Sequence, residues 1–355
     1  MTTNLFAFLA KKRLTVLLVF LILPLSYGIA WMILSQWSFY QISKILSSTV
    51  RPYMAIDTSQ FIRSGFPFAI SWRVSSLKIL SPLIDGKLLL KFSNISFGVS
   101  AFNPTTLNTN ADGIHLTLIN RRDESLWKFQ SKQFQVKIVK KNSHRVELFF
   151  ELEDVKLLKQ EGTKLDPNWE EYVASNNLVV NVQQVSSKET TTQKSTANIL
   201  ADIDDIKLRS SPLNNFKNVN KGHLNLAVIG DLDAWRISDI VDWRDDGGII
   251  EIKNMKVDAS PINLEMNGTV SLDQELKPIG AGTVLVYGAE EIINEKIVAG
   301  DMSRTEGLMA QLALSLLPSK KNSAGKLSIQ IPITAQEGKL RLGPFLITEL
   351  FSIVR

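Results

Sequence analysis

Hydrophobic and polar residues alternate over most of this 355-residue chain, and this alternation limits the folds that it can adopt. The segment INLEMNGTVSLD, residues 262–273, is the clearest case. Its apolar phase comprises Ile262, Leu264, Met266, Val270 and Leu272, with a glycine between them, and its other phase is polar. Side chains of a β-strand point alternately to the two faces of its sheet. The segment therefore predicts a strand with one apolar face, which meets a second sheet, a helix or a ligand.

Many other segments share this pattern, which predicts a mainly β protein built from antiparallel sheet. They lie near residues 68–74, 88–92, 95–99, 114–118, 134–138, 146–152, 178–182, 224–228 and 327–333. Turn-forming residues separate several of them, at Asn103-Pro104, Asp112-Gly113, Asn220–Gly222 and Glu337-Gly338. The sheet can form a sandwich, a barrel or an open groove. Between Ile252 and Met255 the apolar phase changes parity, which predicts a β-bulge near Asn254.

Few segments have helical periodicity. Residues 233–246 predict one helix, with Asp233 as N-cap and Gly247 after its end, and Asp166-Pro167 can begin a short one. Residues 289–317 predict a helical pair, 289–299 and 303–317. Ser303 and Glu306 form a capping box for its second helix, whose apolar stripe includes Leu308, Leu312 and Leu316. We expect this pair to cover part of the apolar sheet face.

The N-terminal region predicts a membrane anchor. Residues 14–34, from Leu14 to Leu34, contain no charged side chain and are long enough to cross a hydrocarbon core of about 30 Å. Lys11, Lys12 and Arg13 precede this segment, and Trp31, Trp37 and Tyr40 lie at its far end. Basic residues favour the cytoplasmic side and aromatic rings favour the membrane interface. The alternative is a signal peptide, cleaved near residues 26–30.

These features predict a domain order. Residues 1–13 would be cytoplasmic and residues 14–34 would cross a bacterial inner membrane once. A β-rich region at 35–187, a polar loop at 188–198 and a second β-rich region at 199–355, which contains the helical pair, would follow outside the cytoplasm. Both the anchor and the signal peptide place this body in the periplasm.

Composition argues against several classes of function. The chain has no cysteine, which excludes disulfides and thiol catalysis. Its net charge is +5, of which residues 11–13 supply three, so the body is too evenly charged to indicate nucleic-acid binding. The histidines and acidic clusters lack metal-ligand spacing, and the pattern at Gly280-Ala281-Gly282 lacks the context of a dinucleotide site. The histidines are His115, His144 and His223, and the clusters are at Asp202/Asp204/Asp205, Asp231/Asp233 and Asp245/Asp246. We expect no catalytic residue, cofactor or metal.

Three short motifs resemble the domain of unknown function 2125 family, whose members are exported bacterial proteins. They are RSGFPFAISWRVSSLKI at 63–79, INLEMNGTVSLDQELKPIGAGTVLVYG at 262–288, and IPITAQEGKLRLGPFLI at 331–347. The pattern of an anchor followed by repetitive strands is also similar to AsmA and TamB-type envelope proteins. That similarity implies an apolar groove for phospholipid, by analogy of fold alone.

Two main functions follow from these observations. The first is a membrane-anchored, non-enzymatic periplasmic protein whose apolar face holds phospholipid acyl chains during envelope biogenesis. The second is a structural or partner-binding module with a closed core. An enzyme would require distant residues to assemble a site that the sequence does not reveal. The bilayer is the expected partner, and protein partners are not indicated.

Overall fold

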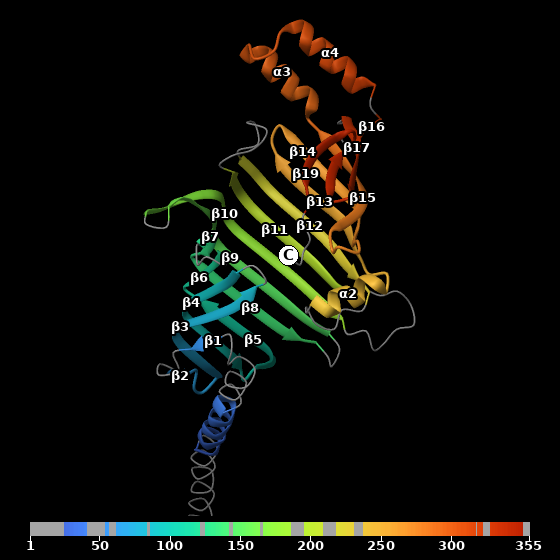
Figure 1. Cartoon of the computed structure of the whole chain (residues 1–355). Coiled ribbons are helices and arrows are strands. Elements are labelled where there is room, and N and C mark those ends of the chain that lie inside the picture. Colours follow the sequence, from blue (N-terminus) through green and yellow to red (C-terminus); the bar gives the residue numbers. More distant parts are fainter. Residues whose placement is uncertain are drawn as a thin grey trace, which may run out of the picture.

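The computed structural model describes most of the chain. The described residues are 25–40, 54–56, 62–83, 86–120, 125–141, 145–163, 166–185, 195–208, 218–230, 237–316, 318–321 and 327–350. Residues 25–40 form a helix, here called the N-terminal helix, and the remainder is dominated by one antiparallel sheet (Figure 1). The predicted mainly β, antiparallel class is therefore confirmed.

The first half of the chain supplies ten strands. They are β1 (Met54–Ile56), β2 (Ile62–Ser64), β3 (Ala69–Leu83), β4 (Gly86–Ser100), β5 (Asn103–Ala111), β6 (Gly113–Asn120), β7 (Ser125–Ser131), β8 (Gln133–Lys140), β9 (Arg145–Thr163) and β10 (Asp166–Val185). Thus Asp166-Pro167 begins a strand, and the short helix predicted there is wrong. Both residues pair with the end of β9, opposite Thr163 and Gly162, as the first rungs of a long ladder.

The second half supplies nine strands and three helices. They are β11 (Ser195–Leu208), β12 (Asn218–Ile229), α2 (Ile237–Asp245), β13 (Ile249–Ala259), β14 (Ile262–Leu272), β15 (Pro278–Tyr287), α3 (Ala289–Ala299), α4 (Arg304–Ser315), β16 (Ser319–Lys321), β17 (Leu327–Gln336), β18 (Lys339–Leu342) and β19 (Phe345–Glu349). The helices predicted at 233–246, 289–299 and 303–317 correspond to α2, α3 and α4. Residues 195–198, predicted as loop, belong to β11, which pairs with β10, so the sheet continues from the first half into the second.

The sheet is a meander in which strands close in sequence pair with each other. β5 and β6 together pair with β4, and β7 and β8 together pair with β5 and β6. Each of these pairs therefore acts as one long bent strand. From β9 to β15 each strand pairs with the next, and β17 pairs with β15 beyond the helical pair.

A line of irregular residues crosses the strands at their bends. Asn94, Asp154 and Asp205 have φ values of 48°, 51° and 52°, which Asn and Asp tolerate better than other non-glycine residues. The Asn94 amide donates to Asp112 at 2.9 Å, and the Asn176 amide donates to Asp205 at 2.8 Å. These irregular residues lie opposite one another, so the registers on both sides of the line agree. We call them the bulge line.

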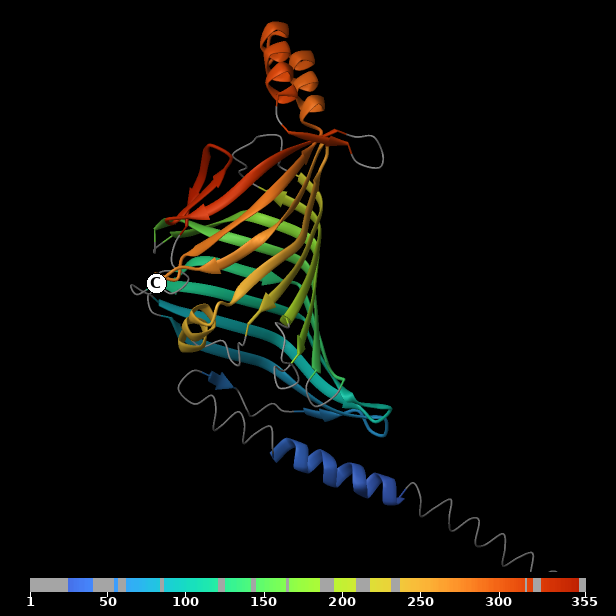
Figure 2. The same cartoon turned by 90° about the vertical axis from the view of Figure 1, so that its right-hand side faces the viewer.

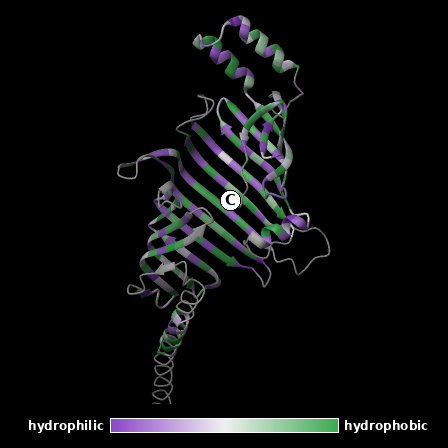
Figure 3. Ribbon diagram, in the orientation of Figure 1, coloured by the Kyte–Doolittle hydropathy of each residue, from purple (hydrophilic) through white to green (hydrophobic). Residues whose placement is uncertain are grey.

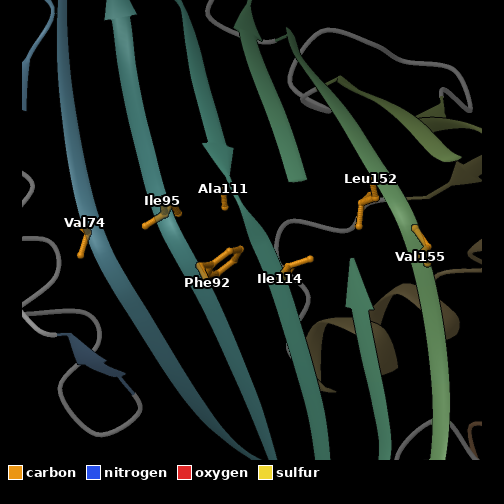
Figure 4. Close-up of a cluster of buried hydrophobic side chains, with 7 residues drawn as sticks. All are labelled: Val74, Phe92, Ile95, Ala111, Ile114, Leu152 and Val155. Carbon is orange, nitrogen blue, oxygen red and sulfur yellow. The ribbon is translucent and has the colours of Figure 1, made fainter. Parts of the chain in front are cut away.

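The bulge line keeps one face of the sheet apolar. In β4 the residues on the apolar face are even-numbered up to Phe92 and odd-numbered from Ile95, and in β9 the change falls between Leu152 and Val155. All four nevertheless belong to one buried cluster, with Val74, Ala111 and Ile114 (Figure 4). Asp112-Gly113 is thus a bend within a long strand, where the sequence predicted a turn.

The predicted bulge near Asn254 is confirmed by register shifts in both ladders of β13.

The N-terminal helix packs along the beginning of β3. Trp31 donates from Nε1 to the Ala69 carbonyl at 2.8 Å, and its ring meets that of Phe66 edge-on at 5.2 Å. The Tyr27 hydroxyl donates to the Pro67 carbonyl, and the rings of Phe39 and Trp72 lie 5.2 Å apart. The GFPF motif at 65–68 therefore forms the contact surface for this helix.

No helix in the part of the chain that the structure describes has both the length and the apolar character needed to cross a membrane. The predicted anchor at 14–34 is described only from residue 25, and Leu14 lies outside the described residues. Leu34, Trp37 and Tyr40 are exposed on the N-terminal helix.

The buried hydroxyl of Ser131 should stabilise the bulge line. It lies 2.6 Å from the Gln133 carbonyl and 2.7 Å from the Glu153 carbonyl, and it can donate to either. Ser131→Ala should lower the free energy of unfolding by about 1–3 kcal/mol, because the buried hydrogen bond that this hydroxyl donates is lost. The Glu153 carbonyl still accepts from the Lys132 amide. Denaturant titration measures the effect. Ser75→Ala, at an exposed position on the same line, is the control, and an equal loss there would contradict the interpretation.

Trp31 should hold the N-terminal helix on the sheet. Trp31→Ala removes a hydrogen bond and an aromatic contact, which together contribute about 1–3 kcal/mol. We expect faster hydrogen exchange of the backbone amides of residues 66–72 in the full chain in detergent micelles. Trp37→Ala is the matched control, because Trp37 is 60% exposed. Equal protection in wild type and Trp31→Ala would show that the contact does not hold the helix.

Candidate functional site: a continuous apolar face

The apolar phases of twelve strands meet in one row across the sheet. Directly opposed residues of antiparallel strands point to the same face. The pairings connect Trp72, Phe97, Thr109, Val136, Phe150, Val180, Ala201, Leu224, Met255, Met266, Val284 and Ile331 in that order. We call this the apolar row. Eleven of its members are apolar, and at a spacing of about 4.8 Å between strands the row is roughly 50 Å long.

The residues next to the apolar row point to the opposite face and are mostly polar. They are Arg73, Ser96, Asn110, Gln135, Glu151, Val179, Asp202, His223, Lys256, Glu265, Leu285 and Gln330. We call them the polar row. Lys256 and Glu265 form an ion pair at 3.2 Å within it. Figure 3 shows the resulting alternation of hydrophobic and hydrophilic residues along the strands. The sheet is thus amphipathic over its whole width.

The apolar face lies on the concave side of the sheet. Seen from the side in Figure 2, the first and the last strands reach toward the same side, and α2 lies on that side. Trp243 of α2 is buried against Ala197 and Val228, in a cluster that also contains Leu226 and Ile250. These strand residues belong to the apolar phase. Because α2 packs on them and lies on the concave side, the apolar face is the concave face. Trp243 also donates from Nε1 to the Ile229 carbonyl at 2.9 Å.

Much of the apolar row remains partly accessible. Trp72, Val136 and Val284 are buried, but Phe97, Phe150, Val180, Leu224 and Met266 are half-buried and Met255 is exposed. A closed sandwich would bury the central residues of this face more completely. The described part of the chain therefore presents the apolar row as a partly exposed floor on the concave side of the sheet.

Three glycines form the thinnest part of this floor. Gly268, Gly280 and Gly282 lie on the apolar phase of β14 and β15, and Gly268 and Gly282 oppose each other. A side chain on Gly282 would collide with the Asn267 carbonyl, so only glycine fits there. The Gly280-Ala281-Gly282 segment lies within the antiparallel strand β15. A small hollow, about 50 Å³, lies over these glycines, lined in part by Ile252, Met266, Val270 and Ile333.

The predicted apolar residues of β14 all lie on this face, whereas those of α4 do not. Ile262 is buried, and Leu264, Met266, Val270 and Leu272 are half-buried. Leu308, Leu312 and Leu316 are exposed on a helical pair that projects from the end of the sheet in both views (Figures 1 and 2). The expectation that this pair covers the sheet is wrong. α4 packs on α3 through Gly307, and its leucines face outward.

The described histidines and acidic residues named in the sequence analysis lie mainly on the polar face, on the bulge line and on α2. His223 lies on the polar face, with Nδ1 2.7 Å from Asp202 Oδ1, and Asp205 belongs to the bulge line. Burial, together with Lys128 and Lys91, lowers the pKa of His115 on the same face. Asp245 pairs with Arg244 at 2.7 Å. No metal-binding group is found among the described residues, and His144, Asp231 and Asp233 lie outside them.

A larger hollow of about 300 Å³ lies on the polar face. Its lining includes Asn108, Asn110, Gln135, Lys137 and Glu151, with the Phe149 ring beneath Lys137. Amides and an exposed lysine can bind polar groups, but this set does not contain a nucleophile beside a general base. The apolar row is therefore the stronger candidate site.

Sequence reasoning identified several strands of the apolar face but missed the bulge line that aligns them. A signal was present in the sequence, since apolar parity changes at Asn94, Asp112, Asp154 and Asp205. The role of the GFPF motif in binding the N-terminal helix was also missed. It depends on a contact between residues nearly 40 positions apart.

Comparison with known proteins places this architecture in a family. The family model described as an uncharacterized protein conserved in bacteria (DUF2125) matches residues 54–350, which include every strand from β1 to β19. No curated protein and no solved structure matches the chain. The chain belongs to the DUF2125 family, as the three sequence motifs predicted.

Proposed function

We propose that the protein is a non-enzymatic lipid-binding protein, in which the apolar row holds phospholipid acyl chains. The observation that carries this proposal is the continuity of the row across twelve strands, combined with its partial exposure. Water in contact with such a face is displaced favourably by an apolar ligand. The proposed role is lipid binding or transfer in envelope biogenesis, as the resemblance to AsmA-type proteins implies.

The length and chemistry of the row suit an acyl chain. Burial of one methylene contributes about 0.8 kcal/mol, so a long chain can bind without a specific set of polar contacts. The row is roughly 50 Å long, which is longer than one extended acyl chain. Several positions along the row are therefore equivalent for the ligand. Such equivalence would let a chain move along the floor without breaking specific hydrogen bonds.

The N-terminal end of the row meets the proposed membrane anchor. Residues 14–34 would cross the inner membrane, with the N-terminus in the cytoplasm and the sheet in the periplasm. Trp72 begins the apolar row, and its ring lies 5.2 Å from Phe39 of the N-terminal helix. A lipid that leaves the membrane along this helix would thus reach the row directly.

Exposed aromatic residues at the same end support this orientation. Phe66 and Phe68 are exposed on the GFPF turn, and Phe102 stacks on Phe68 at 5.6 Å. Trp31 packs beside them, with the Arg63 guanidinium 5.5 Å from its ring centre. Aromatic rings near an arginine are typical of the headgroup region of a bilayer. We propose that this surface rests on the membrane around the anchor.

Paired substitutions in neighbouring residues test the lipid site. Leu224→Asn/Met255→Asn places two amides on the apolar row, where an acyl chain cannot bond to them. We expect the phospholipid that copurifies with the full chain to fall about tenfold, because the amides must be desolvated. Native mass spectrometry of the detergent-solubilised protein measures the bound lipid.

The control changes the same two strands on their other face. His223→Asn/Lys256→Asn lies in the polar row, one residue away in each strand, and should leave lipid binding unchanged. Circular dichroism confirms that both variants keep the sheet. If wild-type protein contains no lipid in repeated preparations, or if both variants lose it equally, the apolar row is not the lipid site.

A further inference from the structure

The helical pair α3–α4 presents an apolar surface that nothing in the described structure covers. Val298, Leu308, Met309, Leu312 and Leu316 are 61–88% exposed, and we call them the hairpin stripe. Four of them follow one another at helical spacing along α4 and its C-cap, and Val298 is on α3. Such exposure is unusual for five large apolar residues of one short helical pair. The stripe is not part of the groove, because the pair projects away from the sheet (Figures 1 and 2).

The internal packing of the pair fixes the stripe on its outer side. Gly307 is buried against Ile297, and any side chain at Gly307 would collide with it. The Gln311 amide donates to Asn294 Oδ1 at 3.1 Å across the same interface. The capping box is complete, since Ser303 accepts from the Glu306 amide and Glu306 accepts from the Ser303 amide. The packing between the two helices and the cap of α4 thus do not use the stripe, which remains available for a partner.

We infer that the hairpin stripe inserts into the surface of a second lipid bilayer, at the opposite end of the sheet from the membrane anchor. α4 has twelve residues and is about 18 Å long, which is too short to cross a bilayer but sufficient to lie in its interface. After Glu306 the helix carries no charge, and Lys320 and Lys321 follow it in the sequence. Basic residues near an apolar helix favour binding to anionic headgroups.

A second copy of the chain suits this surface less well. Each partner of a stable dimer buries about 800 Å². The free energy of burying one large apolar side chain, divided by its value per unit area, indicates that the five side chains of the stripe would bury roughly 300–600 Å². An amphipathic helix binds a bilayer through a stripe of this size together with nearby basic residues.

The helical pair lies at one end of the apolar row. α3 follows β15 directly, and the short strand β16 and then β17 follow α4. The pair is therefore inserted between the two strands that end the apolar row at Val284 and Ile331. The N-terminal helix lies at the other end, beside Trp72. A bilayer at each end would make the row a path between two membranes. This direction of transfer rests on the proposed function, but the insertion of the stripe does not.

A fluorescent label on the stripe tests the insertion. The chain has no cysteine, so Leu312→Cys can be labelled uniquely with an environment-sensitive nitrobenzoxadiazole dye. The full chain is reconstituted in proteoliposomes, and separate vesicles of phosphatidylethanolamine and phosphatidylglycerol are then added. We expect a blue shift and at least a twofold rise in emission on addition. Glu295→Cys, exposed on α3 outside the stripe, should show no change.

Vesicle capture provides the second measurement. Leu312→Glu/Leu316→Glu should abolish cosedimentation of the added vesicles with the proteoliposomes, whereas Asn267→Glu/Ala299→Glu, with the same charge at exposed positions outside the stripe, should preserve it. Leu312→Glu/Leu316→Glu should still carry phospholipid, so failure of the groove and failure of the hairpin are distinguishable.

Three results would overturn the inference. The label on Leu312→Cys could fail to respond to added vesicles. It could be blue-shifted before addition in a manner that depends on protein density, which would indicate a second copy. It could also be blue-shifted before addition at every density, which would indicate that the stripe folds onto its own chain or its own membrane.

Discussion

The structure depends on the pairing rule that opposed residues of antiparallel strands share a face. Eleven consecutive ladders obey it without a slip along the apolar row, from β3 to β17. A slip of one residue in any ladder would turn every later strand over and mix polar side chains into the row. The bulge line shows how long strands satisfy this rule. Each strand bends at the same place as its neighbours, and serines such as Ser131 and Ser175 bond the carbonyls at the bend.

In an amphipathic sheet, the apolar face favours burial and the edge strands have unpaired backbone groups. α2 covers part of the apolar face through Trp243, and the N-terminal helix packs at the first edge. At the other side β18 and β19 extend the sheet, and Phe345, Leu346 and Ile347 of β19 remain exposed. The two ends of the apolar row are also where the exposed aromatic and aliphatic residues gather. This distribution agrees with the proposed lipid ligand, because burial of such residues needs no directional contact.

Sequence reasoning was most successful where structure is local. Alternation located the strands, the change of parity located the bulge at Asn254, and the capping box located α4. It failed where identical local signals serve different tertiary roles. Asp112-Gly113 has turn chemistry but lies in a bend, because Asn94 of the neighbouring strand accommodates it. Asp166-Pro167 suits a helix start, but the ladder with β9 outweighs this preference. The stripe of α4 was identified, yet periodicity indicates only that a face is apolar, not what it contacts.

The candidate site illustrates the same limit in a stronger form. Catalytic and metal sites require particular residue types at particular separations, which a sequence can reveal. A groove lined by the apolar row requires only the pattern that any buried sheet shows. Leu224 and Met255 would have the same alternation in a closed sandwich, where they would be core residues. Whether they form a core or a binding floor depends on whether another layer covers them, which is a property of the topology. The proposed binding site is therefore defined by the partial exposure of the apolar row, because no second sheet covers it in the described part of the chain.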